Sequence, residues 1–252
     1  MSRRFDLGVY LVTDRTALLG RDLVDVVGQA VAGGVGLVQL REKNTVTREF
    51  VALARALVTL LRPYGVPLLI NDRVDVALAV GADGVHVGQE DMDPADVRAL
   101  LGPEKIIGLS VTGEAETRAA QGMPVDYLGA GPIFATTTKK DAGAPQGLDG
   151  LSTMLALAEV PVVAIGAINA DNAGAVMAAA NSGHSRKTAR RPASRVAATA
   201  GSGPRPKKTG RSPCPKVVNV PGPTARVRIA PVSSVTQRRS GRFPWGMPAS
   251  FP

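Results

Sequence analysis

Two aspartates, Asp72 and Asp91, each come shortly after an apolar run of the sequence. If the two runs are neighbouring parallel strands, both carboxylates lie at the same end of the sheet and face one another. Mg²⁺ takes octahedral oxygen ligands and usually accepts one or two protein carboxylates, with water and substrate phosphates in the other positions. The pair therefore predicts a magnesium site that binds a diphosphate. An aspartate after a strand is also a common helix N-cap, and that alternative stays open for each residue.

Cationic and polar side chains accompany these carboxylates. Gln39, Arg41 and Lys43 alternate after another apolar run, so the strand period of two points them the same way. Together with Lys139, from a distant part of the sequence, Arg41 and Lys43 supply the positive charge that neutralises a diphosphate. In the alternative, they pair with acids such as Glu42 on a solvated rim.

A second group of candidates lies later in the sequence. Ser110 either donates its hydroxyl to a phosphate oxygen or caps the helix expected near residue 112. The segment 129–141, GAGPIFATTTKKD, is long for a loop between a strand and a helix, and such loops often bind ligands. Its threonine hydroxyls suit an anionic substrate, although the run also fits a linker. Gly166 lets backbone N–H groups approach a second phosphate, or it serves a tight turn. We expect His86 to be a packed, hydrogen-bonded core residue.

The elements that position these residues are short apolar runs with amphipathic stretches between them. Continuous apolar runs are typical of parallel strands covered on both faces. The predicted strands cover residues 9–12, 36–40, 67–70, 84–87, 106–109, 126–130 and 161–165, with helices over 47–61 and 93–101. This alternation predicts an α/β fold, either a (β/α)8 TIM-type barrel or an open doubly wound sheet. The polar residues follow five successive strands, and in a barrel those strand ends converge on one mouth, which favours the barrel.

Charge divides the 252-residue chain into two parts. Residues 1–180 carry 15 Lys and Arg against 21 Asp and Glu, whereas residues 181–252 carry 15 Lys and Arg and no acid. The periodic pattern also stops after residue 180. We therefore expect an incomplete TIM-barrel catalytic domain over 1–180, with the eighth β/α unit missing, and a basic, disordered tail over 181–252.

Composition also bears on partners and location. The part that can fold is acidic, so the overall charge of +9 does not indicate specific nucleic-acid binding. The single cysteine, Cys214, excludes an intrachain disulfide. The first apolar run is too short for a signal peptide, and no stretch approaches the roughly 18 apolar residues of a membrane span. We expect a cytoplasmic protein without membrane contact, and the sequence leaves homo-oligomer formation open.

Taken together, these segments resemble the thiamine-phosphate synthase family, in the order in which the family has them. The matching segments are YLVTDR at 10–15, QLREK at 39–43, LLINDRVDVALAVGADGVHVGQEDM at 68–92, GLS at 108–110, GAGPIFATTTKKD at 129–141 and VVAIGAI at 162–168. The resemblance implies a transferase of thiamine biosynthesis. Such an enzyme condenses 4-amino-2-methyl-5-pyrimidinylmethyl diphosphate with a thiazole phosphate and releases thiamine phosphate and diphosphate.

The resemblance also implies roles for individual residues. It implies that Arg41, Ser110 and Lys139 are the catalytic residues. It also implies that Asp72 and Asp91 bind Mg²⁺. The residues implied to contact the pyrimidine diphosphate are Gln39, Leu40, Arg41, Glu42, Lys43, Asn71, Ser110 and Lys139. Those implied to contact the thiazole phosphate are Thr136, Thr137, Thr138 and Gly166. In this chemistry diphosphate leaves first, and the thiazole nitrogen captures a pyrimidine-stabilised methylene cation, so no protein nucleophile is needed.

Two alternatives to an active synthase remain open from the sequence. The related thiazole tautomerases share the fold but lack the magnesium carboxylates, and they place a histidine where this chain has Pro132. The family also continues with a GADGVAVVSAI-like eighth strand, in place of which this chain has residues 181–252. Without that strand, the chain would be a folding-impaired or inactive synthase whose basic tail binds polyanions nonspecifically and in a salt-dependent way.

Overall fold

The computed structural model describes residues 5–136, 143–169, 171–188 and 227–229, in which strands and helices alternate. The strands are β1 (Tyr10–Val12), β2 (Leu37–Leu40), β3 (Leu68–Asn71), β4 (Gly84–Val87), β5 (Ile106–Val111), β6 (Tyr127–Ala130), β7 (Val162–Ala164) and β8 (Val227–Ile229). The α-helices are α1 (Leu23–Ala32), α2 (Thr47–Leu61), α3 (Val74–Val80), α4 (Pro94–Leu101), α5 (Glu114–Ala119), α6 (Gly147–Leu157) and α7 (Ala173–Thr188). Two 3₁₀ turns are η1 (Thr16–Leu18) and η2 (Arg62–Tyr64).

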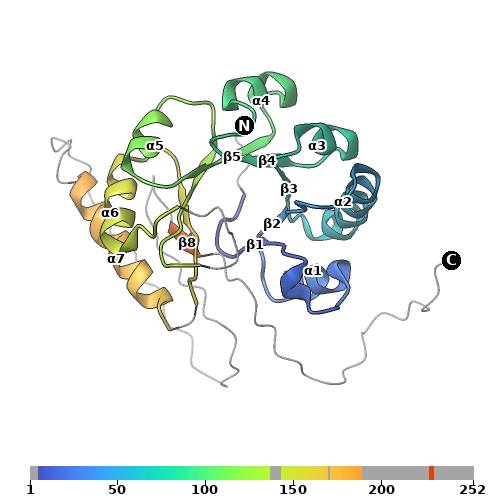
Figure 1. Cartoon of the computed structure of the whole chain (residues 1–252), viewed down its shortest axis with the longest axis horizontal. Coiled ribbons are helices and arrows are strands. Elements are labelled where there is room, and N and C mark those ends of the chain that lie inside the picture. The colour runs from blue at the N-terminus through green and yellow to red at the C-terminus, as the bar shows by residue number, and fades with distance from the viewer. Residues whose placement is uncertain (1–4, 137–142, 170, 189–226, 230–252) are drawn as a thin grey trace, which may run out of the picture.

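The strands form one parallel sheet in the sequential order β1 to β8, and the helices lie around its outside (Figure 1). An open doubly wound sheet reverses its strand order at a switch point, whereas a barrel does not. The sequential strand order therefore identifies the fold as the barrel type and excludes the open doubly wound sheet. Among the described residues, no strand pairing joins β8 back to β1.

The eighth strand position is where the structure differs from the sequence prediction of a missing unit. Residues 227–229 form β8, which pairs in parallel with β7 from Val162↔Val227 to Ala164↔Ile229. Without a neighbouring strand, the edge of β7 would have a row of unpaired backbone N–H and C=O groups. β8 provides hydrogen-bond partners for these groups. α7 continues to Thr188, past residue 180 where the sequence pattern stops. Most of the predicted tail, residues 189–226 and 230–252, lies outside the described residues.

The two helices expected from amphipathic patterns are confirmed. α2 has the predicted bounds and buries Phe50, Ala54, Leu57 and Leu61 on one face. α4 begins at Pro94, and the Asp93 side chain accepts a hydrogen bond from the Ala95 N–H (2.7 Å). Aspartate at the N-cap followed by proline satisfies one of the free N–H groups at the helix start and fixes the first turn.

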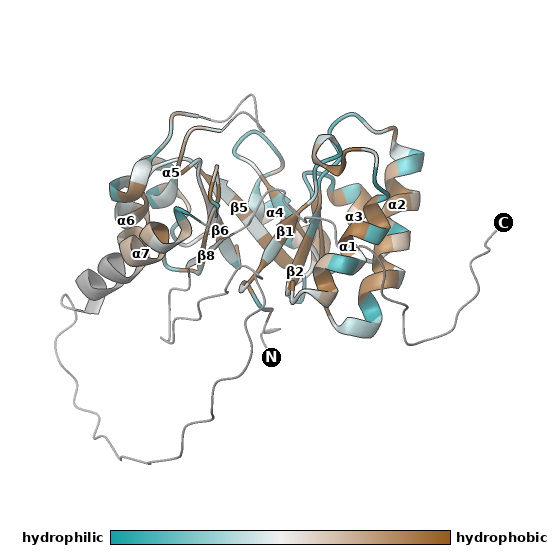
Figure 2. Cartoon of the chain, turned by 90° about the horizontal axis from the view of Figure 1, so that it is seen from below, coloured by the Kyte–Doolittle hydropathy of each residue, from teal (hydrophilic) through white to brown (hydrophobic). Residues whose placement is uncertain are grey.

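Alternate residues of each strand face two different apolar layers. Val38, Leu40 and Ile70 belong to the layer between the sheet and the helices. Leu37, Leu69, Ile106, Tyr127 and Val163 belong to a second cluster inside the curved sheet. This is the inward and outward alternation of a barrel, and Figure 2 shows the apolar residues along β2 and the neighbouring helices. Gln39 is two residues after Leu37 in the same strand, so its side chain also faces the interior.

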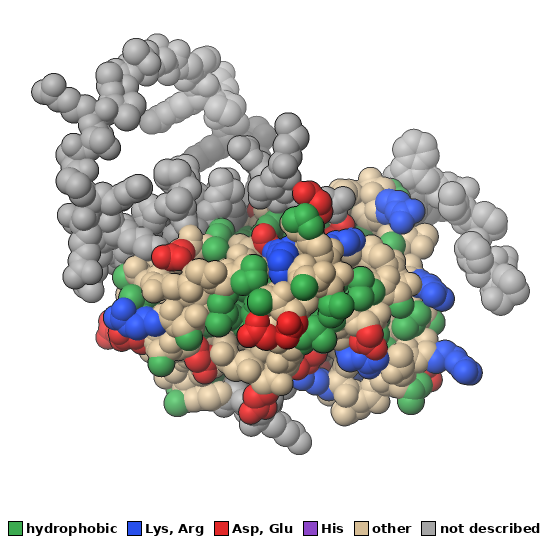
Figure 3. Space-filling view, turned by 90° about the horizontal axis from the view of Figure 1, so that it is seen from above, with side chains coloured by type: hydrophobic (Ala, Val, Ile, Leu, Met, Phe, Trp, Pro, Cys, Tyr) green, Lys and Arg blue, Asp and Glu red, His purple; other side chains and the backbone are tan. Residues whose placement is uncertain are grey.

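One face of the molecule carries side chains of both charges. On the face drawn in Figure 3, acidic and basic side chains are interspersed with apolar ones. None of the helices in the described part of the chain has the length and apolar character needed to cross a bilayer.

Candidate active site

Asp72 and Asp91 lie together beyond the carboxyl ends of β3 and β4. Asp72 directly follows β3 in a left-handed backbone conformation (φ 61°), which a non-glycine residue adopts at a cost. Its N–H donates to the carbonyl of His86 on β4 (2.9 Å). The backbone N–H of Gly88 donates to Asp91 Oδ2 (2.7 Å). Burial raises the pKa of Asp91, and the neighbouring Asp72 carboxylate raises it further, so the predicted pair is close enough to interact.

Neither of these carboxylates caps a helix. Arg73 precedes α3 and makes no side-chain capping bond, and the cap of α4 is Asp93. The Asp72 carboxylate instead accepts a hydrogen bond from Lys43 Nζ (2.8 Å). The N-cap alternative is therefore wrong for both Asp72 and Asp91.

The donor set at this point suits Mg²⁺ and a phosphate. Two adjacent carboxylates repel one another, and a divalent cation between them removes that repulsion. In the described part of the chain, no group of three or more His, Cys, Asp or Glu side chains is placed to hold a metal. The Asp72 and Asp91 pair is thus a two-carboxylate arrangement, in which water and phosphate oxygens would supply most of the ligands of a Mg²⁺ ion.

Glu42 does not form the rim pair with Arg41 or Lys43 that the sequence left open. Its carboxylate pairs with Arg15 Nε (2.6 Å) and accepts from the Thr45 hydroxyl. The Glu42 side chain is almost fully buried, and its Oε1 has no hydrogen-bond partner among the described residues. Sequence reasoning did not place Arg15 at the site. Arg15 is the last residue of the YLVTDR segment that carries the family resemblance, and its ion pair with Glu42 joins the loop after β1 to the loop after β2.

A chain of hydrogen bonds crosses the barrel interior beneath the mouth. Gln39 Nε2 donates to the Tyr10 hydroxyl (2.6 Å), which is bonded to the Tyr127 hydroxyl (2.8 Å). Tyr127 is bonded to His86 Nδ1 (2.7 Å), and His86 Nε2 to Ser110 Oγ (2.9 Å). We call these five residues the interior network. The prediction that His86 is a packed, hydrogen-bonded residue is confirmed, whereas Tyr10 and Tyr127 were not singled out from the sequence.

The remaining predicted residues fall into three groups. Asn71 is buried at the end of β3, and Leu40 is fully buried between sheet and helices, so only the Leu40 backbone is available to a substrate. Gly166 has φ 109°, and a Cβ there would lie 2.7 Å from Pro132 Cα, so close packing against the β6 loop requires glycine. Thr136 is among the described residues. Thr137, Thr138 and Lys139 lie outside them.

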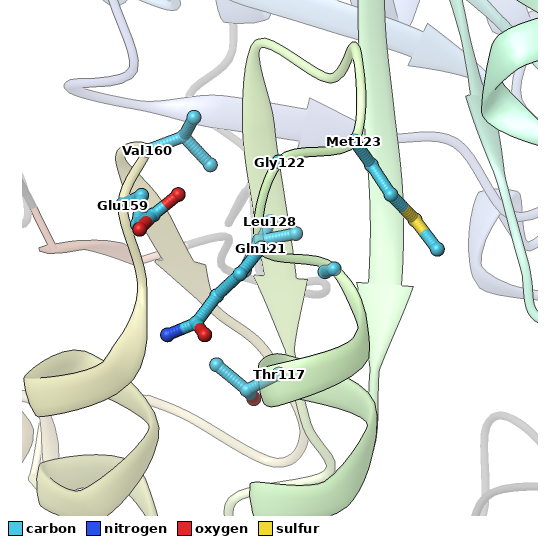
Figure 4. A pocket seen from close by; sticks show the side chains of 8 residues that line it. Thr117, Gln121, Gly122, Met123, Leu128, Glu159 and Val160 are labelled. Atoms are coloured by element: carbon cyan, nitrogen blue, oxygen red, sulfur yellow. The ribbon is translucent and has the colours of Figure 1, made fainter.

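A small pocket lies at the opposite end of the strands from these residues. It has a volume of about 100 Å³ and opens between the end of α5, β6 and the residues before β7 (Figure 4). Gln121 and Glu159 line it together with apolar side chains, and the Gln121 amide donates to the Leu157 carbonyl (2.9 Å). Active sites of β/α barrels are built at the carboxyl ends of the strands, so this pocket is not the candidate site.

Comparison with known proteins gives one consistent result. The family described as Thiamine monophosphate synthase matches residues 9–186. A thiamine-phosphate synthase of Solidesulfovibrio magneticus is 74% identical over 162 residues, which cover 64% of this chain and 77% of that protein. One of Moorella thermoacetica is 47% identical over 197 residues, covering 78% of this chain and 93% of that protein.

Solved structures agree with the sequence relatives. The thiamine phosphate pyrophosphorylase from Pyrococcus furiosus superposes with a TM-score of 0.62 at 40% identity, covering 69% of this chain and 81% of that one. The segments that carry the site, from the YLVTDR run to the VVAIGAI run, all lie inside the matched residues 9–186. With the barrel order and the paired carboxylates in place, the conclusion is that this chain belongs to the thiamine monophosphate synthase family of transferase enzymes.

Proposed function

We propose that this chain condenses 4-amino-2-methyl-5-pyrimidinylmethyl diphosphate with a thiazole phosphate, releasing thiamine phosphate and diphosphate. The observation that carries the proposal is the cluster of Asp72, Asp91 and Lys43 at the barrel mouth. A tautomerase of the related type needs no magnesium carboxylates. In this chain Asp72 and Asp91 are both present, and neither carboxylate caps α3 or α4. This arrangement favours a reaction that releases diphosphate.

In this proposal the protein acts through position and charge. Asp72 and Asp91 would hold Mg²⁺, which supplies positive charge at the departing diphosphate. Lys43 holds the Asp72 carboxylate in place and adds a cation beside it, and Arg41 follows β2 on the same edge. Ser110 donates a hydrogen bond to the diphosphate, and Gln39 and Asn71 contact the same substrate. Such fixed charges and donors stabilise the leaving group as its charge develops.

The second substrate is assigned to the other side of the mouth. The thiazole phosphate would contact Gly166 and the hydroxyls of Thr136, Thr137 and Thr138, while Lys139 would reach the diphosphate. The close approach of Gly166 to Pro132 supports this assignment, because it brings the loop after β7 against the loop that leads to Thr136. Two substrates held at one mouth in this way react as if in an intramolecular step.

The test of the proposal compares two aspartate variants of the full chain. Asp91→Asn removes one magnesium ligand, whereas Asp93→Asn removes the same charge two residues away and keeps a good N-cap on α4. We expect the parent and Asp93→Asn to form thiamine phosphate in a Mg²⁺-dependent way, and Asp91→Asn to lose at least about 100-fold in kcat/KM.

The outcomes separate the metal role from the reaction itself. Equal turnover by Asp91→Asn and the parent contradicts the metal role of Asp91. Absence of thiamine phosphate formation by the folded parent, with both substrates and Mg²⁺ present, contradicts the proposed reaction. Folding is checked by circular dichroism on all three proteins.

A further inference from the structure

The interior network links two sides of the candidate site through the middle of the barrel. It begins at Gln39 on β2 and runs through Tyr10 on β1 and Tyr127 on β6 to His86 on β4 and Ser110 on β5. Both tyrosines are fully buried, and Gln39 and His86 are nearly so. Each bond is between 2.6 and 2.9 Å long. Because Gln39 and Ser110 are both assigned to the diphosphate substrate, the network joins two substrate contacts that lie far apart in the sequence.

Two strand glycines make room for the rings of this network. A Cβ on Gly108 would lie 2.1 Å from Tyr127 Cζ and 2.2 Å from its hydroxyl. A Cβ on Gly129 would lie 3.0 Å from His86 Cε1. Glycine inside a strand weakens it and often marks a close approach. Its use at both positions shows that the network fills space which the strands leave for it.

The direction of the hydrogen bonds follows from the first donor. The Gln39 amide donates to the Tyr10 oxygen, so the Tyr10 hydroxyl hydrogen has the Tyr127 oxygen as its acceptor. The Tyr127 hydrogen then goes to His86 Nδ1, and the proton of the neutral imidazole is on Nε2, from which it points to Ser110 Oγ. In the reverse direction Tyr10 would accept from both neighbours, and its own hydrogen could go to neither of them.

We propose that the interior network fixes His86 as the Nε2–H tautomer and thereby turns the Ser110 hydroxyl hydrogen out toward the barrel mouth. Tyr10, Tyr127 and His86 are then positioning residues, which act on the substrate through Ser110. In the opposite orientation Ser110 would donate to His86 and present only lone pairs to the mouth, which repel diphosphate oxygens. Burial raises the pKa of both tyrosines, so they remain neutral donors. The substrate side of this inference rests on the proposed function, whereas the tautomer does not.

The tautomer is measured directly on a chain in which His86 and the other four residues of the interior network are unchanged. The sequence has two histidines, so His184→Gln leaves His86 alone in a nitrogen-15 spectrum of the imidazole ring. We expect a neutral ring protonated at Nε2 at neutral pH. A ring protonated at Nδ1, or a charged ring, overturns the proposal whatever the activity of the enzyme is. The expected tautomer in a folded parent that makes no thiamine phosphate supports the network and contradicts the proposed function instead.

Kinetics test the effect on the substrate. Tyr127→Phe removes one hydroxyl of the network with little change of shape, and Tyr64→Phe makes the same change at a residue that is 63% exposed. We expect Tyr127→Phe to raise the KM for the pyrimidine diphosphate about three- to tenfold, the loss of one oriented hydrogen bond, with the KM for the thiazole phosphate unchanged. Tyr64→Phe should match the parent. Equal rises in both KM values, or no rise, contradict a positioning role.

A pair of histidine variants supplies the rescue experiment. The amide N–H of Gln in His86→Gln can replace the Nε2–H donor to Ser110, whereas His86→Leu fills similar space without a donor. We expect His86→Gln to retain at least about threefold more kcat/KM for the pyrimidine diphosphate than His86→Leu. Equal losses in the two variants show that His86 only fills space, and overturn the proposal. If a His86 variant does not fold, the nitrogen-15 measurement of the His86 tautomer still tests the proposal.

Discussion

Replacing Gly108 by alanine tests whether the barrel interior is packed as the structure has it. Gly108 lies in β5 beside Tyr127 of β6, its register partner. The added Cβ would lie 2.1 Å from Tyr127 Cζ, 2.2 Å from the hydroxyl oxygen and 2.4 Å from Cε1. Ordinary contacts between carbon atoms are about 3.5–4.0 Å, so the ring must move by about 1.4 Å or more. Tyr127 is fully buried, and its ring packs against Phe5 and Tyr10.

Two effects contribute to the loss of stability expected for Gly108→Ala. Overpacking of a close-packed interior costs about 1–3 kcal/mol. A shift of the Tyr127 ring by this distance also breaks its hydrogen bonds to Tyr10 and His86, each worth about 0.5–1.5 kcal/mol net. Gly108→Ala should therefore lower the free energy of unfolding by about 2–6 kcal/mol. That is a large share of the roughly 5–15 kcal/mol of a typical domain.

The assay is urea unfolding followed by circular dichroism, with Gly28→Ala as the matched control. Gly28 lies inside α1, and a Cβ there would meet only the Leu60 methyl groups at 3.9 Å. Alanine in a helix interior is better than glycine by roughly 1 kcal/mol, so Gly28→Ala should stabilise the protein. A Gly108→Ala protein within about 0.5 kcal/mol of the parent would refute the reasoning, because the ring and the new methyl group cannot share that space.

Three further predictions concern charge and hydrogen bonding. Burial raises the pKa values of Tyr10 and Tyr127 above those of tyrosines in the unfolded chain. The free energy of unfolding should therefore be constant below about pH 10 and decrease as the pH rises further. Tyr127→Phe should make this decrease smaller, as measured by melting curves at a series of pH values. Lys43→Met removes a half-exposed ion pair, so it should cost less than about 1 kcal/mol in urea unfolding but raise the KM for the pyrimidine diphosphate at least about tenfold. Arg98→Met removes donors to the carbonyls of residues 102, 105 and 124 and to Asp126, and should cost about 2–4 kcal/mol in the same assay; an unchanged midpoint would contradict that bonding.

Local patterns in the sequence were enough for the elements and for much of the site. Continuous apolar runs predicted β1 to β7, and amphipathic spacing predicted α2 at its observed bounds. The side chains of Asp72, Asp91 and Lys43 were found because residues after parallel strands meet at one edge whatever the details of packing. The sequential strand order confirms the barrel type.

Contacts between residues on different sides of the barrel could not be predicted from local sequence patterns. Glu42 pairs with Arg15 rather than with the neighbouring cations, and β7 finds its edge partner in residues 227–229. Both contacts join segments that are distant in the sequence, and periodicity carries no information about such pairs. The hydrogen bonds of Tyr10 and Tyr127 belong to the same class.

The sequence by itself determined the family, the strand and helix pattern and the residues that gather at the mouth. These depend on side-chain type and on a period of two or 3.6 residues, which are local properties. Only the tertiary structure decided that Asp72 is held by Lys43 instead of capping α3, and that Ser110 is tied through His86 and Tyr127 to the far side of the barrel. A hydrogen bond depends on the distance between its two atoms to within a few tenths of an ångström and on their direction, and that geometry exists only once the sheet has curved around its interior.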